Sequence, residues 1–142
     1  MFFNKKEKDN TNFDLVKIGA LLIHAAKIDE NYSIEEENII KKTLLSLGAD
    51  KDKLDALIEK AKNCEENSNQ ILDFTREIKN LKEISKIKII KSLWKIIYSN
   101  NDADIYETNL MRRLAGLLYI DSKIMGDIKE EIKKHNNRVK TK

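Results

Sequence analysis

Apolar residues recur at every third or fourth position along most of this chain, and this spacing constrains its fold more than any other feature. Leu15, Ile18, Leu22 and Ala25 set the pattern, which is typical of the buried face of an α-helix. The chain has 4 glycines and no proline, so the frequent turns of an all-β sandwich are missing. We therefore expect an all-α fold, in one compact domain because the chain has only 142 residues.

About seven helices are predicted from this spacing. They cover roughly residues 12–28, 33–47, 51–63, 71–78, 83–99, 104–118 and 121–135. The helix at 83–99 is apolar around most of its circumference, so we expect it to be central, and we expect His24 and Trp94 to lie in the interior. The polar stretch from Asn63 to Asn69 is predicted to be a loop.

The domain boundaries follow from the same pattern. The helical domain is expected to span 12–135. A loosely ordered N-terminus is expected at 1–11 and a basic C-terminal tail at 136–142.

An internal two-helix pseudo-repeat emerges when the sequence is shifted by 71 positions. Each copy is an apolar helix, an acidic loop and a second helix that opens with a capping sequence. The matching pairs are Leu22 with Leu93, Ser33 with Asp104, Glu36 with Glu107, Ile39 with Leu110 and Leu47 with Leu118.

Charge and cysteine content restrict the partners and the compartment. The net charge is +3, from 27 basic and 24 acidic residues, which is too balanced for a dedicated nucleic-acid binder. Cys64 is the only cysteine, so no internal disulfide can form, which fits a reducing cytoplasm. The apolar stretch from Ile18 to Ala26 is too short to span a bilayer. We expect a cytoplasmic protein with at most peripheral membrane association.

Two acidic loops, at 29–37 and 100–107, are the candidate metal sites. Oxygen-bearing side chains alternate in both loops and could converge on a hard cation such as Ca²⁺ or Mg²⁺. The loops are not EF-hands, because Ile34 and Ile40 stand where the first loop would need Gly and Glu. The alternating side chains are Asp29, Asn31 and Ser33 in the first loop and Asn100, Asp102 and Asp104 in the second.

Helix capping is the competing interpretation of these acids, and from the spacing alone we favour it. Ser33 with Glu36, and Asp104 with Glu107, each have the spacing of a capping box. Acidic side chains also suit the positive end of a helix dipole. Capping leaves other loop acids, such as Asp29 and Asp102, without a role.

No catalytic residues are predicted. Two histidines far apart in the sequence do not indicate a nucleophile–base arrangement, and the glycines are too scattered for a phosphate-binding loop. We therefore expect a protein that is not an enzyme and has no small-molecule substrate.

Several segments together resemble the tellurite-resistance TerB family. They are Ala25–Asp29 with Glu35 and Glu36 downstream, then Leu93–Tyr98 leading into Asn100–Glu107. The resemblance implies a seven-helix domain with an acidic, metal-binding surface and a non-enzymatic role in stress response or in assemblies near the membrane. The acidic positions that the resemblance implies are Asp29 and Glu36 in the first repeat and Asp104 and Glu107 in the second. The Asp-Gly of the family's loops is replaced here by Asp29-Glu30 and by Asn100-Asn101.

Two functions are therefore expected. The first is a non-enzymatic TerB-like domain whose loops bind a divalent metal ion weakly. Its candidate ligands are Asp29, Glu36, Asp102, Asp104 and Glu107. The alternative is a protein-interaction or scaffold module, in which the acids only cap helices and a helical groove lined by Tyr98, Tyr106 and Met111 binds the partner. In both cases the partner is a protein or a second copy of the chain, and not a nucleic acid.

Overall fold

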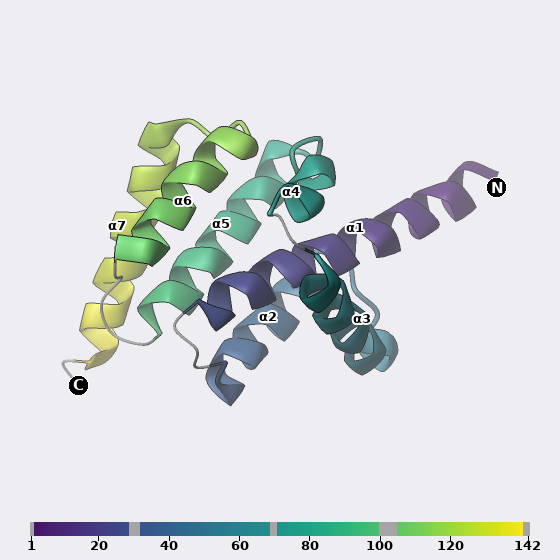
Figure 1. Cartoon of the computed structure of the whole chain (residues 1–142), viewed down its shortest axis with the longest axis horizontal. Coiled ribbons are helices and arrows are strands. Elements are labelled where there is room, and N and C mark those ends of the chain that lie inside the picture. The colour runs from purple at the N-terminus through teal and green to yellow at the C-terminus, as the bar shows by residue number, and fades with distance from the viewer. Residues whose placement is uncertain (1, 29–31, 69–70, 100–104, 141–142) are drawn as a thin grey trace.

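A computed structural model shows seven α-helices, one short 3₁₀-helix and no strand in the part of the chain that it describes (Figure 1). That part covers the backbone of 2–28, 32–68, 71–99 and 105–140, and the side chains of 15–28, 32–68, 71–76, 78–99 and 109–135. The elements are α1 (Phe2–Lys27), α2 (Ile34–Ser46), η1 (Lys51–Lys53), α3 (Leu54–Asn67), α4 (Leu72–Ile78), α5 (Glu83–Tyr98), α6 (Ile105–Leu117) and α7 (Ser122–Lys140). The prediction of an all-α domain is confirmed.

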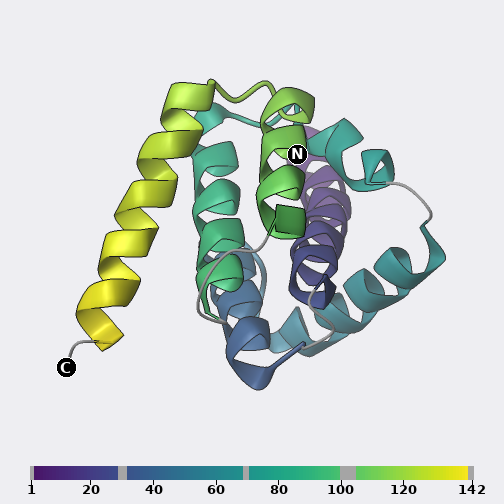
Figure 2. The ribbon, with the colours of Figure 1, turned by 60° about the vertical axis from the view of Figure 1, so that its left-hand side comes forward.

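Two apolar helices form the centre of the molecule. α1 packs against α2, α3, α4 and α5, and α5 in turn packs against α2 and α7 (Figures 1 and 2). Their facing residues are fully buried, because nearly every position on the inner side of both helices is aliphatic. Among these are Leu21, Leu22, Ile23, Ile89, Ile90, Leu93, Ile96 and Ile97. The predicted central position of the fifth helix is confirmed.

The structure reproduces the internal repeat of the sequence. A shift of 71 residues brings the end of α1 onto the end of α5 and both bounds of α2 onto those of α6. α2 and α6 also end alike, each with a left-handed residue, Gly48 (φ 111°) and Tyr119 (φ 57°). The amide that follows each of them bonds back into the last helical turn at 2.9 Å, from Ala49 to Leu44 and from Ile120 to Ala115.

Three helix boundaries differ from the predictions. α1 begins at Phe2 rather than near residue 12, and α7 continues to Lys140 rather than 135. The predicted loop from Asn63 to Asn69 is wrong, since α3 remains helical as far as Asn67. The polar composition of that turn reflects its surface position rather than a break in the helix. The domain boundaries at 11 and 135 stay predictions.

α1 and α3 approach each other closely at Gly19. A Cβ atom placed on Gly19 would lie 2.9 Å from the Cβ of Ala61, closer than two carbon atoms can sit. The missing side chain at Gly19 therefore sets the distance between these two helices.

None of the helices in the described part of the chain is both long enough and apolar enough to cross a bilayer.

Candidate functional site

The predicted capping box at the start of α2 is present. The Ser33 hydroxyl accepts a hydrogen bond from the Glu36 amide at 3.1 Å. The Glu36 carboxylate, through Oε1, accepts from the Ser33 amide at 2.9 Å and from the Ser33 hydroxyl at 3.0 Å. Glu36 is only 1% exposed. The cap therefore supplies the polar partners that a buried carboxylate needs.

The next carboxylate, Glu37, joins α2 to α3. Its Oε1 lies 3.1 Å from Lys62 Nζ and accepts a hydrogen bond from the Tyr32 hydroxyl at 3.4 Å. The hydrogen bond with Glu37 raises the pKa of Lys62. Burial, together with the charge of Glu37, raises the pKa of the Tyr32 phenol well above its usual range. Glu37 thus links α2 to α3 and to Tyr32.

The predicted metal ligands fall mostly outside the described residues. Asp29, Asp102 and Asp104 lie there entirely, and so does the side chain of Glu107. Glu36 is described, and its buried carboxylate is already bonded at the helix cap, which does not fit a cation ligand. The described side chains contain no group of three or more His, Cys, Asp or Glu residues placed to share a metal ion. A Ca²⁺ or Mg²⁺ site therefore stays a prediction.

A second set of charges, which the sequence analysis missed, links α3 to α1. Glu65 Oε1 lies 2.6 Å from Lys27 Nζ, and Glu65 Oε2 lies 3.3 Å from His24 Nδ1. Burial opposes ionisation of Glu65, but the hydrogen bonds from Lys27 and His24 outweigh it and lower its pKa. The His24 side chain is 38% exposed, so the prediction of an interior histidine is wrong. Its ring lies at the edge of the core, 6.1 Å from that of Phe74.

A groove with a mainly apolar lining, here named the Trp94 groove, lies between α5, α6 and α7. Its volume is about 520 Å³. It is lined by Trp94, Met111, Arg112, Ala115, Gly116, Ile120, Ser122, Met125, Gly126 and Lys129. Small residues on α6 and α7 leave the groove open. A Cβ atom placed on Gly116 or Gly126 would meet nothing within 4 Å.

Trp94 lies at the base of this groove and is buried, as predicted. Its ring stacks on that of Tyr98, with 5.9 Å between centroids. Its indole N–H finds no acceptor among the described residues. The Nζ of Lys129 lies 5.4 Å from the centre of the indole ring, which is a cation–π contact.

The groove agrees in part with the predicted interaction surface. Met111 lines it, as expected. Tyr98 is buried and supports Trp94 rather than lining the groove, and the side chain of Tyr106 lies outside the described residues.

The fold defines a class of small all-α domains in which a two-helix unit occurs twice, as α1 with α2 and as α5 with α6. A comparison with protein-family models matches residues 16–130 to the family described as Tellurite resistance protein TerB. Because the match covers well over half of the chain, the chain belongs to the TerB family, which confirms the resemblance. Comparisons with curated proteins and with solved structures give no significant match.

Proposed function

We propose that this TerB domain is a non-enzymatic binding module that holds an amphipathic helix of a partner protein in the Trp94 groove. The observation that carries the proposal is the groove itself, a cavity of about 520 Å³ between three helices that is lined by apolar side chains and by the cations Arg112 and Lys129. Grooves of this kind suit a helix that places side chains at i, i+3, i+4 and i+7 along one face.

The lining residues indicate what the partner helix should present. Met111 and Met125 have flexible, polarisable side chains that adapt to different apolar residues. Gly116 and Gly126 allow the partner backbone to approach closely. Arg112 and Lys129 favour acidic residues beside the apolar face. The expected partner is therefore an acidic amphipathic helix.

The roles of the perturbed ionisable groups support a non-enzymatic function. Glu65, Lys62 and Tyr32 have shifted pKa values, and each contacts a charged residue of another segment. Burial and contacts with Glu37 account for the Tyr32 shift, and ion pairs between helices account for the shifts of Lys62 and Glu65. The wider role, in stress response of the tellurite-resistance type within the cytoplasm, is part of the proposal and rests on the family.

The test is a selection of helical peptides on the whole chain, followed by binding measurements through the fluorescence of Trp94, the single tryptophan. We expect selected peptides to combine an apolar face with acidic residues. Gly126→Leu fills the groove and should weaken their binding at least about tenfold, the effect of losing roughly 1.4 kcal/mol.

The matched control is Ala56→Leu, which adds the same side chain on the exposed face of α3 and should leave binding unchanged. Peptides that bind Gly126→Leu as tightly as the unmodified protein would overturn the proposal. If the preferred partner is instead a second copy of the chain, sedimentation will show a dimer that Gly126→Leu dissociates.

Weak binding of Ca²⁺ or Mg²⁺ is the second candidate function, and it rests on the acidic loops of the sequence and on the family. An amide NMR titration with each ion tests it. Saturable shifts that disappear in the Asp29→Asn/Asp102→Asn double variant would support a cation site. Unchanged spectra at millimolar metal would leave the acids as caps and ion-pair partners.

A further inference from the structure

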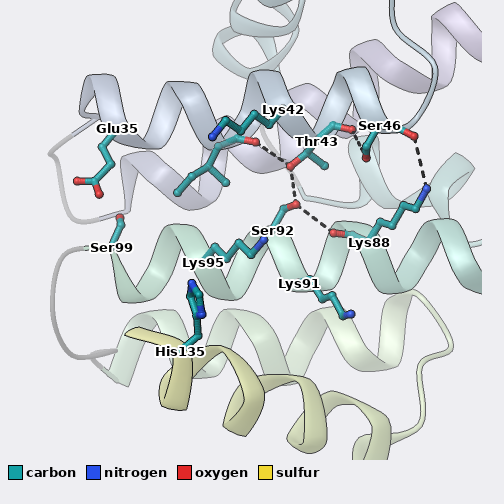
Figure 3. A pocket seen from close by; sticks show the side chains of 11 residues that line it. Glu35, Lys42, Thr43, Ser46, Lys88, Lys91, Ser92, Lys95, Ser99 and His135 are labelled. Atoms are coloured by element: carbon teal, nitrogen blue, oxygen red, sulfur yellow. Dashed lines mark hydrogen bonds between the residues drawn. The ribbon is translucent and has the colours of Figure 1, made fainter. Parts of the chain in front are cut away.

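We propose that a second pocket, separate from the Trp94 groove, binds a short chain of linked phosphates. This pocket, here named the lysine groove, lies between α2, α5 and α7 and has a volume of about 490 Å³ (Figure 3). Cavities of this size hold small molecules. It is lined by Glu35, Ile39, Lys42, Thr43, Ser46, Lys88, Lys91, Ser92, Lys95, Ser99 and His135.

The cations of the lysine groove form a row along one helix. Lys88, Lys91 and Lys95 are spaced i, i+3 and i+7 on α5, so they share one face of that helix over a length of about 10 Å. Lys42 extends from α2 on the opposite wall, and His135 reaches in from α7 beside Lys95 (Figure 3). The arrangement presents positive charge from α2 and α5, and the imidazole of His135 from α7, to one space.

Little within the described residues neutralises these charges. Lys42 and Lys95 form no ion pair there, and Lys91 lies 3.9 Å from Glu131 in a pair that is largely exposed and therefore weak. Lys88 donates to the carbonyl of Ser46 at 3.5 Å, which leaves its charge unpaired. Glu35 is the only carboxylate among the described lining residues. Four lysines against one acid favour an anionic ligand.

The hydroxyl groups of the pocket do not act as free donors. Thr43 donates to Ile39 O at 2.8 Å, Ser46 to Thr43 O at 2.9 Å and Ser99 to Ile96 O at 2.6 Å. Thr43 and Ser92 are also bonded to each other. Recognition therefore depends on lysine ammonium groups, which act as mobile point charges without the fixed fork of arginine. Such a row suits a flexible ligand with several charges rather than one rigid phosphate.

The rest of the lining argues against larger anions. No Phe, Tyr or Trp is among the described lining residues, so a nucleobase would find only the small imidazole ring of His135 on which to stack. Ile39 is the only large apolar residue there, which offers little to a lipid chain. A soluble chain of linked phosphates is long enough to contact the whole lysine row and carries the opposite charge. Its many oxygens can accept hydrogen bonds from the lysines in several orientations.

Calorimetry of the whole chain with sodium tripolyphosphate, compared with inorganic monophosphate at the same ionic strength, tests the proposal. We expect tripolyphosphate to bind more tightly, with an affinity that falls as salt rises. The Lys91→Gln/Lys95→Gln variant should bind it at least about tenfold more weakly, since each lost charged hydrogen bond is worth a severalfold change in affinity. Lys51→Gln/Lys60→Gln removes the same charge from exposed positions outside the groove and should change affinity less than about twofold.

Three results would overturn the proposal. The first is the absence of tripolyphosphate binding at millimolar concentration. The second is equal weakening by the two double variants, which would indicate a general charge effect. The third is binding to phosphatidylserine vesicles or single-stranded RNA that depends on Lys91 and Lys95 while tripolyphosphate binding does not, which would assign the groove to a membrane or a nucleic acid.

Discussion

Glu36 is buried at the start of α2, where it accepts hydrogen bonds from the amide and the hydroxyl of Ser33. An unpaired carboxylate in this position would be costly, and the cap removes that cost while satisfying helix amides that lack partners within the helix. The sequence predicted this arrangement because both residues lie within one turn of each other. At this scale, acidic residues of the described chain stabilise its own helices.

Glu36→Ala should lower the free energy of unfolding by about 1–3 kcal/mol, because it removes the cap and leaves the Ser33 donors without their acceptor. Glu35→Ala changes an exposed neighbour and should cost no more than about 0.5 kcal/mol. Urea denaturation of both variants measures the difference. Equal stability of the two would show that the buried carboxylate has no structural role.

Glu65 makes stability depend on pH. Its pKa is lowered in the folded chain by Lys27 and His24, so its ionised form stabilises the fold. This contribution is complete above the ordinary carboxyl pKa of 4.5 and is lost as the pH falls through the lower pKa of the folded state. Glu65→Gln should therefore destabilise the protein at pH 7, and the difference from the unmodified protein should shrink in acid.

Unfolding measured across this pH range tests the prediction, with the exposed neighbour Glu66→Gln as control. A stability difference for Glu65→Gln that stays constant into acid would contradict the ion-pair account. The sequence did not predict this cluster because the partners of Glu65 lie 38 and 41 residues away and meet only when α1 packs on α3.

At the scale of elements, periodicity and capping signals located the helices well, whereas polar helix ends were missed. The repeat gave α2 and α6 matching bounds, since the same local signals occur 71 residues apart. The last turn of α3 and the extension of α7 carry few apolar residues, so periodicity could not detect them. A helical turn without apolar residues gives no periodic signal, so its helix cannot be followed to its end from the sequence.

Two glycines should respond in opposite directions to the same substitution. Gly19→Ala pushes α1 and α3 apart at Ala61 and should destabilise the protein by about 1–3 kcal/mol. Gly126→Ala in the interior of α7 meets no neighbour and should stabilise the protein by about 0.5–1 kcal/mol. Thermal or urea unfolding distinguishes them. A stabilising Gly19→Ala would contradict the close packing of these helices.

At the scale of the whole molecule, the fold was predictable and the binding surfaces largely were not. The apolar pattern specifies which helix faces are buried, and this was enough for an all-α domain with α5 at its centre. The lysine groove combines residues from Glu35 to His135 on three helices, in a sequence where basic residues are common throughout. The Trp94 groove is left open by small residues on α6 and α7 that both face it. Which residues of two helices face the same space depends on tertiary packing.

An amide NMR titration with the tightest selected helical peptide tests most directly whether the Trp94 groove of this TerB domain binds a partner helix. We expect shifts to gather at the lining residues of α5, α6 and α7, and to disappear in Gly126→Leu. Shifts centred instead on Tyr32–Glu37, or unaffected by Gly126→Leu, would contradict binding in the Trp94 groove.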